Sequence, residues 1–246
     1  MQTKFKYFLV VALFITVLAA CEKQYDIKAS YTTDLATNTN IKVFNATLNS
    51  ARNYVYSGST PLTGASISYA GTSSFPANNS YASITAGNIN LIIKDTLPTT
   101  TQLPLNFSST FEAGKFYSIF MYDTLTATKY KIVTDQIIVP TDSSVRFRFV
   151  NLFYSSTPVP NVDVFSWKAN ANIATNIATN DVTVFKDHSF RLDTLYFRAA
   201  GTTTELIKYY YSGLTSTRSY TLIMRGRYQN SGVQAVPRTL SLYNTY

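Results

Sequence analysis

Apolar and polar residues alternate along most of the chain after residue 40, in short runs that turn residues separate. In the run from Val145 to Phe149 every second side chain is apolar, so an extended strand there has one apolar and one polar face. The pattern predicts strands over 41–45, 89–94, 116–122, 130–138, 145–151, 189–192, 195–198, 206–211, 220–225 and 239–243. We predict no amphipathic helix after residue 20, and we expect the polar stretch 170–180 to be a loop.

Residue pairs that favour turns separate these runs at short intervals; examples are Ala86-Gly87, Ala113-Gly114 and Ser212-Gly213. Short alternating strands with turns at this spacing favour antiparallel β-sandwiches. The predicted fold class is therefore all-β.

The chain also repeats itself at intervals of about a hundred residues. The strand ending at Asn45 matches the one ending at Asn151, the run 116–121 matches 219–224, and 131–135 has a counterpart around 238–242. Such a period indicates two copies of one sandwich. Pro140 ends strand pairing and is followed by turn residues, so we predict one domain over 39–140 and a second over 141–246.

The N-terminus has the pattern of a secretion signal. Lys4 and Lys6 precede an apolar run over 8–20, which has the length of a signal-peptide core and is short for a membrane span. The ending Leu18-Ala19-Ala20-Cys21 resembles the lipobox of bacterial, Bacteroidota-like lipoproteins. We predict a signal peptide over 1–20, lipidation of Cys21, and a flexible tether over 21–38. The alternative is an anchor helix or a buried N-terminal helix, with Cys21 as a passive small residue.

Composition fits an exported β-protein. The chain is 46% hydrophobic and 15% aromatic but only 14% charged, and its one cysteine leaves no disulfide. The net charge of +8 is uneven: residues 22–140 carry eight Lys/Arg against seven Asp/Glu, whereas residues 141–246 carry eleven against six. Alternation places Arg146 and Arg148 on one strand face, which suits an anionic ligand or protects a sheet edge. A lipid-anchored exported protein rarely meets nucleic acid, so we expect no nucleic-acid partner.

A family resemblance rests on the start of the second copy. Arg148-Phe149-Val150-Asn151, Pro158 and the run from Pro160 to Val164 resemble the opening motif of the domain of unknown function 4397 family, which occurs in tandem in exported bacterial proteins. The Ala-Gly turns at 86–87 and 113–114 resemble later parts of that motif. The first copy lacks the motif's Asp, and the second lacks the Ala-Gly turns. The resemblance implies two tandem immunoglobulin-like antiparallel β-sandwiches at the cell surface and no known activity.

Catalytic and metal-binding signals are weak. His188 is the only histidine, so a zinc cluster of His residues and a Cys–His pair are excluded, and no Gly-x-Ser-x-Gly segment supports a serine nucleophile. Asp163, in a turn that enters a strand, is expected to accept backbone N–H bonds sooner than to bind calcium. We predict no enzyme activity, no cofactor and no metal, with a hydrolase as a remote alternative.

Aromatic residues give the main binding signal. Trp167 is the only tryptophan, and successive side chains of Tyr209, Tyr210 and Tyr211 must point to opposite faces of a strand. These rings either fill the core or stack on a sugar or a partner protein. We therefore expect a lipid-anchored protein of the cell envelope, in the outer membrane, that acts as a structural or adhesive module. The alternative is a glycan-binding lipoprotein associated with polysaccharide uptake, and an exposed aromatic platform would favour it. Strand exchange in a fimbrial assembly, with 239–243 as donor, is a further alternative.

Overall fold

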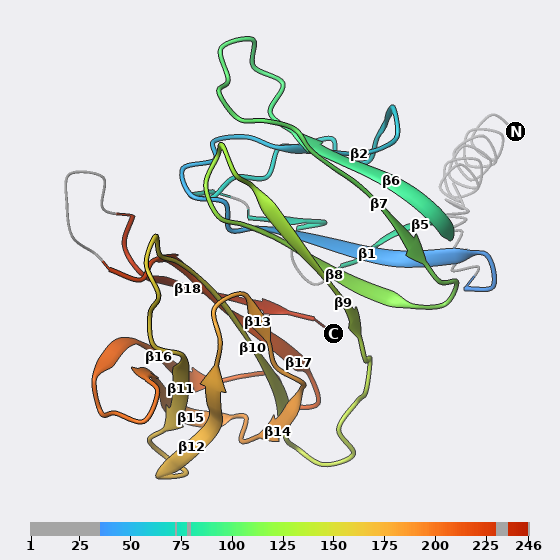
Figure 1. Cartoon of the computed structure of the whole chain (residues 1–246). Helices are drawn as coiled ribbons and strands as arrows, with labels where there is room; N and C mark the ends of the chain where they lie inside the picture. Colours follow the sequence, from blue (N-terminus) through green and yellow to red (C-terminus); the bar gives the residue numbers. More distant parts are fainter. Residues whose placement is uncertain (1–34, 72, 78–79, 230–235, 246) are drawn as a thin grey trace, which may run out of the picture. The chain divides into compact units, whose positions relative to one another are not determined.

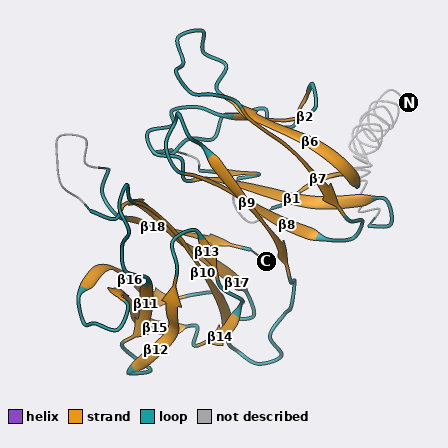
Figure 2. Cartoon of the chain, in the orientation of Figure 1, coloured by secondary structure: helices purple, strands orange, loops and turns teal. Residues whose placement is uncertain are grey.

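The computed structural model describes residues 35–71, 73–77, 80–229 and 236–245. Cys21, the predicted signal peptide and most of the predicted tether lie outside these residues. Within the described ranges all regular structure is β-strand (Figure 2). The described part of the chain contains no helix long and apolar enough to cross a membrane.

The first copy, residues 38–135, forms two sheets. Its strands are β1 (Asn38–Asn45), β2 (Tyr54–Ser57), β3 (Thr60–Pro61), β4 (Ser74–Phe75), β5 (Ala82–Thr85), β6 (Gly87–Lys94), β7 (Leu105–Phe111), β8 (Phe116–Tyr122) and β9 (Lys129–Asp135). The inner sheet has the order β4-β1-β8-β9, with β5 also paired to β1. The outer sheet has the order β3-β2-β6-β7.

The second copy, residues 145–245, repeats this arrangement (Figure 1). Its strands are β10 (Val145–Tyr154), β11 (Val162–Ser166), β12 (Ala171–Ile177), β13 (Asp181–Val182), β14 (Lys186–His188), β15 (Arg191–Ala199), β16 (Glu205–Gly213), β17 (Ser219–Arg227) and β18 (Thr239–Asn244). The inner sheet has the order β13-β10-β17-β18, with β14 also paired to β10, and the outer sheet has the order β12-β11-β15-β16.

The pairing registers of the two copies match residue by residue. Asn40 pairs with Phe116 in the first copy, and Arg146 pairs with Ser219 at the equivalent place in the second. Both of these ladders, β1 with β8 and β10 with β17, are parallel, so each sandwich is antiparallel except at this one ladder. Among the described strands, those before residue 140 pair only with one another, as do those after it. The immunoglobulin-like assignment and the independence of the two domains stay predictions.

The buried asparagines at the ends of the first strands make equivalent bonds. The side-chain oxygen of Asn45 accepts from the backbone N of Thr47, and that of Asn151 accepts from the backbone N of Phe153. Their side-chain nitrogens donate to the backbone oxygens of Ile67 and Ile177 respectively. The repeat read from the sequence is therefore also a repeat of local structure.

Three apolar clusters show how the sheets stack. One cluster fills the first sandwich and another fills the second. The third lies between the two inner sheets, where Phe44 and Phe120 of the first copy meet Val150 and Ile223 of the second. The central inner strands are consequently buried on both faces, one against their own sandwich core and one against the other copy.

The structure corrects three expectations. The stretch 170–180 contains strand β12, whose apolar Ala174 and Ile177 are buried, and a bulge at its pairing with β11 breaks the alternation. Of the predicted strand 189–192, residues 189–190 lie between β14 and β15, and residues 191–192 begin β15. Finally, Thr245 donates its backbone N–H to Ser219, which makes Thr245 the counterpart of Asp135 and moves the equivalent of 131–135 to 241–245.

Candidate functional site

The solvent side of the second outer sheet carries a group of aromatic rings, which we call the aromatic face. It consists of Phe165, Trp167, Tyr196 and Tyr210, with Arg198 and Lys208 beside them. Phe165 pairs with Tyr196, and Tyr196 with Lys208, so these side chains share one face of the sheet. The opposite face is the core side, where Val164 and Leu195 are completely buried.

Trp167 and Tyr210 are the most exposed rings on this face. Trp167 follows the end of β11, and its backbone N–H donates to Thr194 at 3.0 Å, while Thr194 pairs with Tyr210 on β16. The two aromatic residues therefore flank one β15 residue, with Cα atoms two strand spacings apart, or roughly 10 Å. Trp167 is 62% exposed and Tyr210 is 60% exposed, so both rings are open to a ligand.

The three consecutive tyrosines divide between the two faces as predicted. Tyr210 points to solvent, whereas Tyr211 is buried and its hydroxyl donates to the backbone oxygen of Ser189 at 3.0 Å. Tyr209 packs partly buried against the core cluster. Of these three, only Tyr210 is placed to contact a ligand on the aromatic face.

Positive charge lies among the rings. The Arg198 guanidinium lies 4.1 Å from the centroid of the Phe165 ring and 5.3 Å from that of Tyr196. Asp163 pairs with Arg198 in the strand register, but its carboxylate accepts from the backbone N–H groups of Asn176 and Gly201. Within the described residues, neither Arg198 nor Lys208 forms an ion pair. The expectation that Asp163 accepts backbone bonds is confirmed.

A buried polar cluster holds the turn that carries Trp167. Asp193 is fully buried on β15 and accepts from the hydroxyl of Ser166, from the backbone N of Lys168 at 2.9 Å and from the backbone N of Thr194 at 2.7 Å. Burial on its own raises the pKa of Asp193, but these bonds and one with His188 together lower it. The ionised carboxylate thus fixes the backbone on both sides of Trp167.

This cluster is not arranged as a catalytic triad. Ser166 is fully buried, and its hydroxyl donates to the same Asp193 oxygen that contacts His188 Nε2 at 2.9 Å. A triad needs the histidine between the serine and the carboxylate. Among the described residues, no group of His, Cys, Asp and Glu side chains could hold a metal ion.

The first copy has the same pairing registers without the aromatic face, although its turn at Gly58 is tighter and Gly58 has a φ of +57°. In register, Gly58, Asn90 and Ser108 occupy the places of Trp167, Thr194 and Tyr210. The equivalents of Phe165, Tyr196 and Lys208 in the next row are Tyr56, Ile92 and Asn106, respectively. Ile89 stands at the place of Asp193, so the cluster that supports the turn is also absent at this position.

Sequence reasoning identified Trp167 and Tyr210 but missed Phe165, Tyr196, Arg198 and Lys208. Comparing the two copies in register would have found them, because the first copy has at most one ring in the same two rows. Alternation alone says only that they lie on one face.

Arg146 and Arg148 lie on one strand face as predicted, but that face is covered by the first copy. Arg148 is 1% exposed and forms an ion pair with Asp135 of the first copy, and Arg146 donates to the backbone oxygens of Gln136 and Ile138 at 3.5 Å. Arg225 likewise donates to the backbone oxygen of Tyr69. Arg148 and Arg225 therefore join the two copies, while Arg146 contacts the connection after the first copy and lies 3.6 Å from Asp187, so these arginines form no open anionic site.

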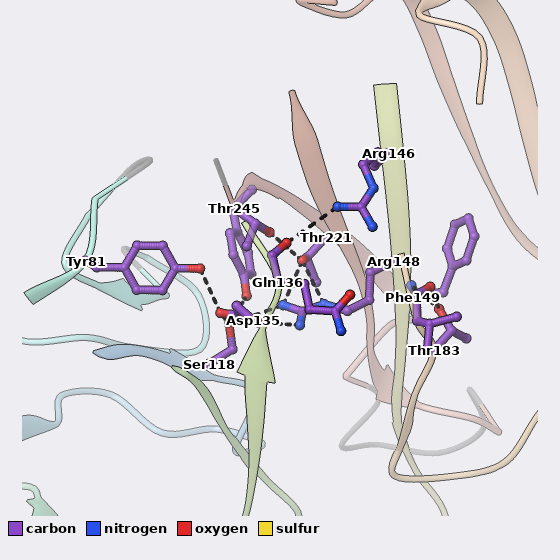
Figure 3. A network of polar contacts seen from close by, with 12 residues as sticks. Tyr81, Ser118, Asp135, Gln136, Arg146, Arg148, Phe149, Thr183, Thr221 and Thr245 are labelled. Carbon is purple, nitrogen blue, oxygen red and sulfur yellow. Dashed lines mark hydrogen bonds and ion pairs between the residues drawn. The ribbon is translucent and has the colours of Figure 1, made fainter. Parts of the chain in front are cut away.

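The ion pair belongs to a polar network between the inner sheets (Figure 3). Asp135 also accepts from the hydroxyls of Tyr81 at 2.7 Å and Ser118 at 2.6 Å. Arg148 donates to Ser118 and Thr221, and Thr221 shares a hydrogen bond of 2.6 Å with Thr245. Burial lowers the pKa of Arg148, but the charge of Asp135, its hydrogen bond to Arg148 and the nearby Tyr243 and Tyr81 together raise it.

Lys42 is a second buried cation beside this network. Its ammonium donates to the backbone oxygen of Asn244 at 3.4 Å and lies 4.5 Å from the ring centroid of Tyr243. Burial lowers the pKa of Lys42 to about 8, although the charge of Asp135 acts in the opposite direction. Lys42 occupies the place in the first copy that Arg148 occupies in the second.

Comparison with known proteins gives distant structural likenesses. The TIE protein of Bacillus anthracis is 9% identical over 77% of this chain, with a TM-score of 0.25, and the chain spans about a third of its length. A family 26 carbohydrate-binding module from Amy13K of Eubacterium rectale, solved with maltoheptaose, is 14% identical, with a TM-score of 0.25. That alignment covers 85% of this chain and 97% of the module. Likenesses at this TM-score carry no argument about fold or function.

No curated protein matches the chain. The family model described as a domain of unknown function, DUF4397, matches residues 39–165, which is just over half of the chain. The match covers the first sandwich and continues through β10 to Phe165 at the end of the quoted Arg-Phe-Val-Asn and Val-Asp-Val motifs. The chain belongs to the family of this domain of unknown function, DUF4397.

Proposed function

We propose that this chain is a non-catalytic, lipid-anchored protein of the cell envelope that binds glycans through the aromatic face of its second copy. Cys21 would carry the lipid and hold the protein at the outer membrane. No catalytic constellation among the described residues competes with this role.

The observation that carries the proposal is the difference between the two copies. The first copy folds with Gly58 and Ser108 at the places of Trp167 and Tyr210, so the fold does not require rings there. Large rings that are exposed without a folding role favour binding. The Asp193 cluster, which has no counterpart at Ile89 of the first copy, supports the same conclusion because it holds the turn that carries Trp167.

The chemistry of the face suits a sugar chain. Its rings lie on one face of the outer sheet and are accompanied by hydroxyl and amide groups, such as those of Thr194, Ser212 and Asn172. Aromatic rings offer flat apolar contact for the C–H faces of a sugar, and the polar groups offer hydrogen bonds to its hydroxyls. Arg198 and Lys208 favour acidic sugars among these ligands.

The test is affinity electrophoresis of the 22–246 chain through gels that contain neutral or acidic polysaccharides. We expect retardation in at least one gel, and loss of retardation in a double variant, Trp167→Gly with Tyr210→Ser. These substitutions introduce the residues of the first copy, so the fold should persist. A loss of tenfold in affinity for each ring corresponds to about 1.4 kcal/mol.

Tyr56→Ala is the matched control, because Tyr56 is the equivalent of Phe165 in the first copy and also lies under a cation, Lys94. Its retardation should equal that of the unsubstituted chain. If no polysaccharide retards the protein, or if the double variant is retarded equally, glycan binding by this face is refuted.

A structural or adhesive role is the second candidate. The observation in its favour is the buried contact between the inner sheets, which would hold two sandwiches as a single spacer. Strand exchange through β18 would remove Tyr243 and Thr245 from that contact, where both are buried. A chain that supports surface assembly without binding any glycan would favour this candidate.

A further inference from the structure

The two copies meet through equivalent faces. Most residues of the apolar contact occupy equivalent positions in the two copies: Phe44 and Val150, Ala46 and Leu152, Phe120 and Ile223, and Val133 and Tyr243. A contact of this kind resembles the interface of a two-fold symmetric dimer, in which the same patch is used by both partners. Here both partners belong to one chain.

The polar residues break this equivalence at one place. The cation on the first inner strand is Lys42 in one copy and Arg148 in the other. The facing position on the last strand is Asp135 in the first copy but Thr245 in the second. Arg148 forms an ion pair with Asp135, whereas Lys42 donates to the backbone oxygen of Asn244 and is affected by the charge of Asp135 within its own copy.

This asymmetry distinguishes the possible pairings. If two second copies met through the same face, each Arg148 would face Thr245 in place of Asp135, and among the described residues each guanidinium group would lose its carboxylate partner. A buried charge that has lost its partner destabilises a contact by several kcal/mol. The carboxylate of Asp135, held by Tyr81 and Ser118, removes this penalty when the partner is a first copy.

We infer that the inner sheet of the second copy is a docking surface specific for the first copy, and that Asp135 is the residue that determines this choice (Figure 3). The apolar cluster supplies the attraction, and the ion pair selects the partner. The docking is then independent of the peptide connection over 136–144.

The experiment uses the full chain with a protease site inserted after Thr141, which is exposed. The folded protein is cut, and the product is followed by gel filtration and native mass spectrometry. We expect the two halves to remain together as one complex that contains each half once. Separation of the unsubstituted halves, or recovery of pairs of the second half, would overturn the inference.

Two variants test the role of Asp135. Asp135→Thr introduces the residue of the second copy and should weaken association of the cut halves by about 100-fold or more. The double variant Asp135→Thr with Arg148→Met removes both charges and should restore association. Glu112→Gln, which removes a charge at an exposed site after β7 of the first copy, is the control and should have no effect. If the double variant dissociates as readily as the single one, charge does not select the partner.

Discussion

Buried Lys42 makes the stability of the fold depend on pH in a direction unusual for a basic residue in a protein. Its pKa falls from 10.5 in the unfolded chain to about 8 in the folded chain, because burial disfavours the charged form. Between these values the unfolded chain holds a proton that the folded chain has released. Stability therefore rises with pH across this window. Each pKa unit is worth about 1.4 kcal/mol, so the full effect is about 3 kcal/mol.

Urea denaturation between pH 7 and 9.5 measures this effect. The free energy of unfolding should rise by about 2 kcal/mol over the range through Lys42 alone. Above pH 10 the buried hydroxyls of Tyr81 and Tyr243 act in the opposite direction, because burial raises their pKa and the folded chain then keeps protons that the unfolded chain loses. The measurements therefore stop at pH 9.5.

Lys42→Met is the decisive variant because it keeps the length of the side chain and removes the charge. The rise with pH should disappear. At pH 7 the variant should be more stable by about 1 kcal/mol, since removing a buried charge outweighs the lost contacts with Asn244 and Tyr243. Lys115→Met, at an exposed site, is the control and should keep the slope of the unsubstituted chain. A flat profile for the unsubstituted chain, or an unchanged slope in Lys42→Met, would refute the reasoning.

Other predictions follow from the repeat and from the N-terminus. Gly226→Ala should destabilise the fold by about 3 kcal/mol in urea titration, because φ is +100° and a Cβ would lie 2.1 Å from the backbone oxygen of Pro237. Asn45→Ala and Asn151→Ala should each lower the free energy of unfolding by about 2 kcal/mol, and a large difference between them would contradict the equivalence of the copies. Cys21→Ser should leave the precursor uncleaved or soluble; full membrane retention after fractionation would contradict lipidation.

The fold was predictable where alternation was strong. The run 116–122 was predicted with the bounds of β8, and the repeat offsets near Asn45 and Asn151 agree with the pairing registers. Weakly apolar edge strands were not predictable in this way. Strand β12 is polar on its exposed face and interrupted by a bulge, and the left-handed φ of 57° at Asn176 marks that irregularity.

The site was predictable in part for a different reason. Alternation shows which side chains share a face, but it does not show what covers that face. Arg146 and Arg148 were placed together, yet the first copy covers them; Trp167 and Tyr210 were singled out, and they are exposed. Lys42 and Arg148 occupy equivalent positions in the two copies. A cation at the same position of both copies is not expected on a strand face that is simply exposed to solvent, so this comparison could have indicated the covered face.

Because the inner strands are buried on both faces, the inner sheets tolerate fewer amino-acid substitutions than the outer sheets. A substitution on an inner sheet must suit a sandwich core or the opposing copy, so the two halves can change there only in step. An outer sheet faces solvent on one side, and each half can alter that side alone. Gly58 in one half and Trp167 in the other occupy equivalent places and show this freedom, since one outer sheet lacks the row of rings that the other carries. We therefore expect the two halves to differ most on the outward faces of their outer sheets and least on the joined inner sheets.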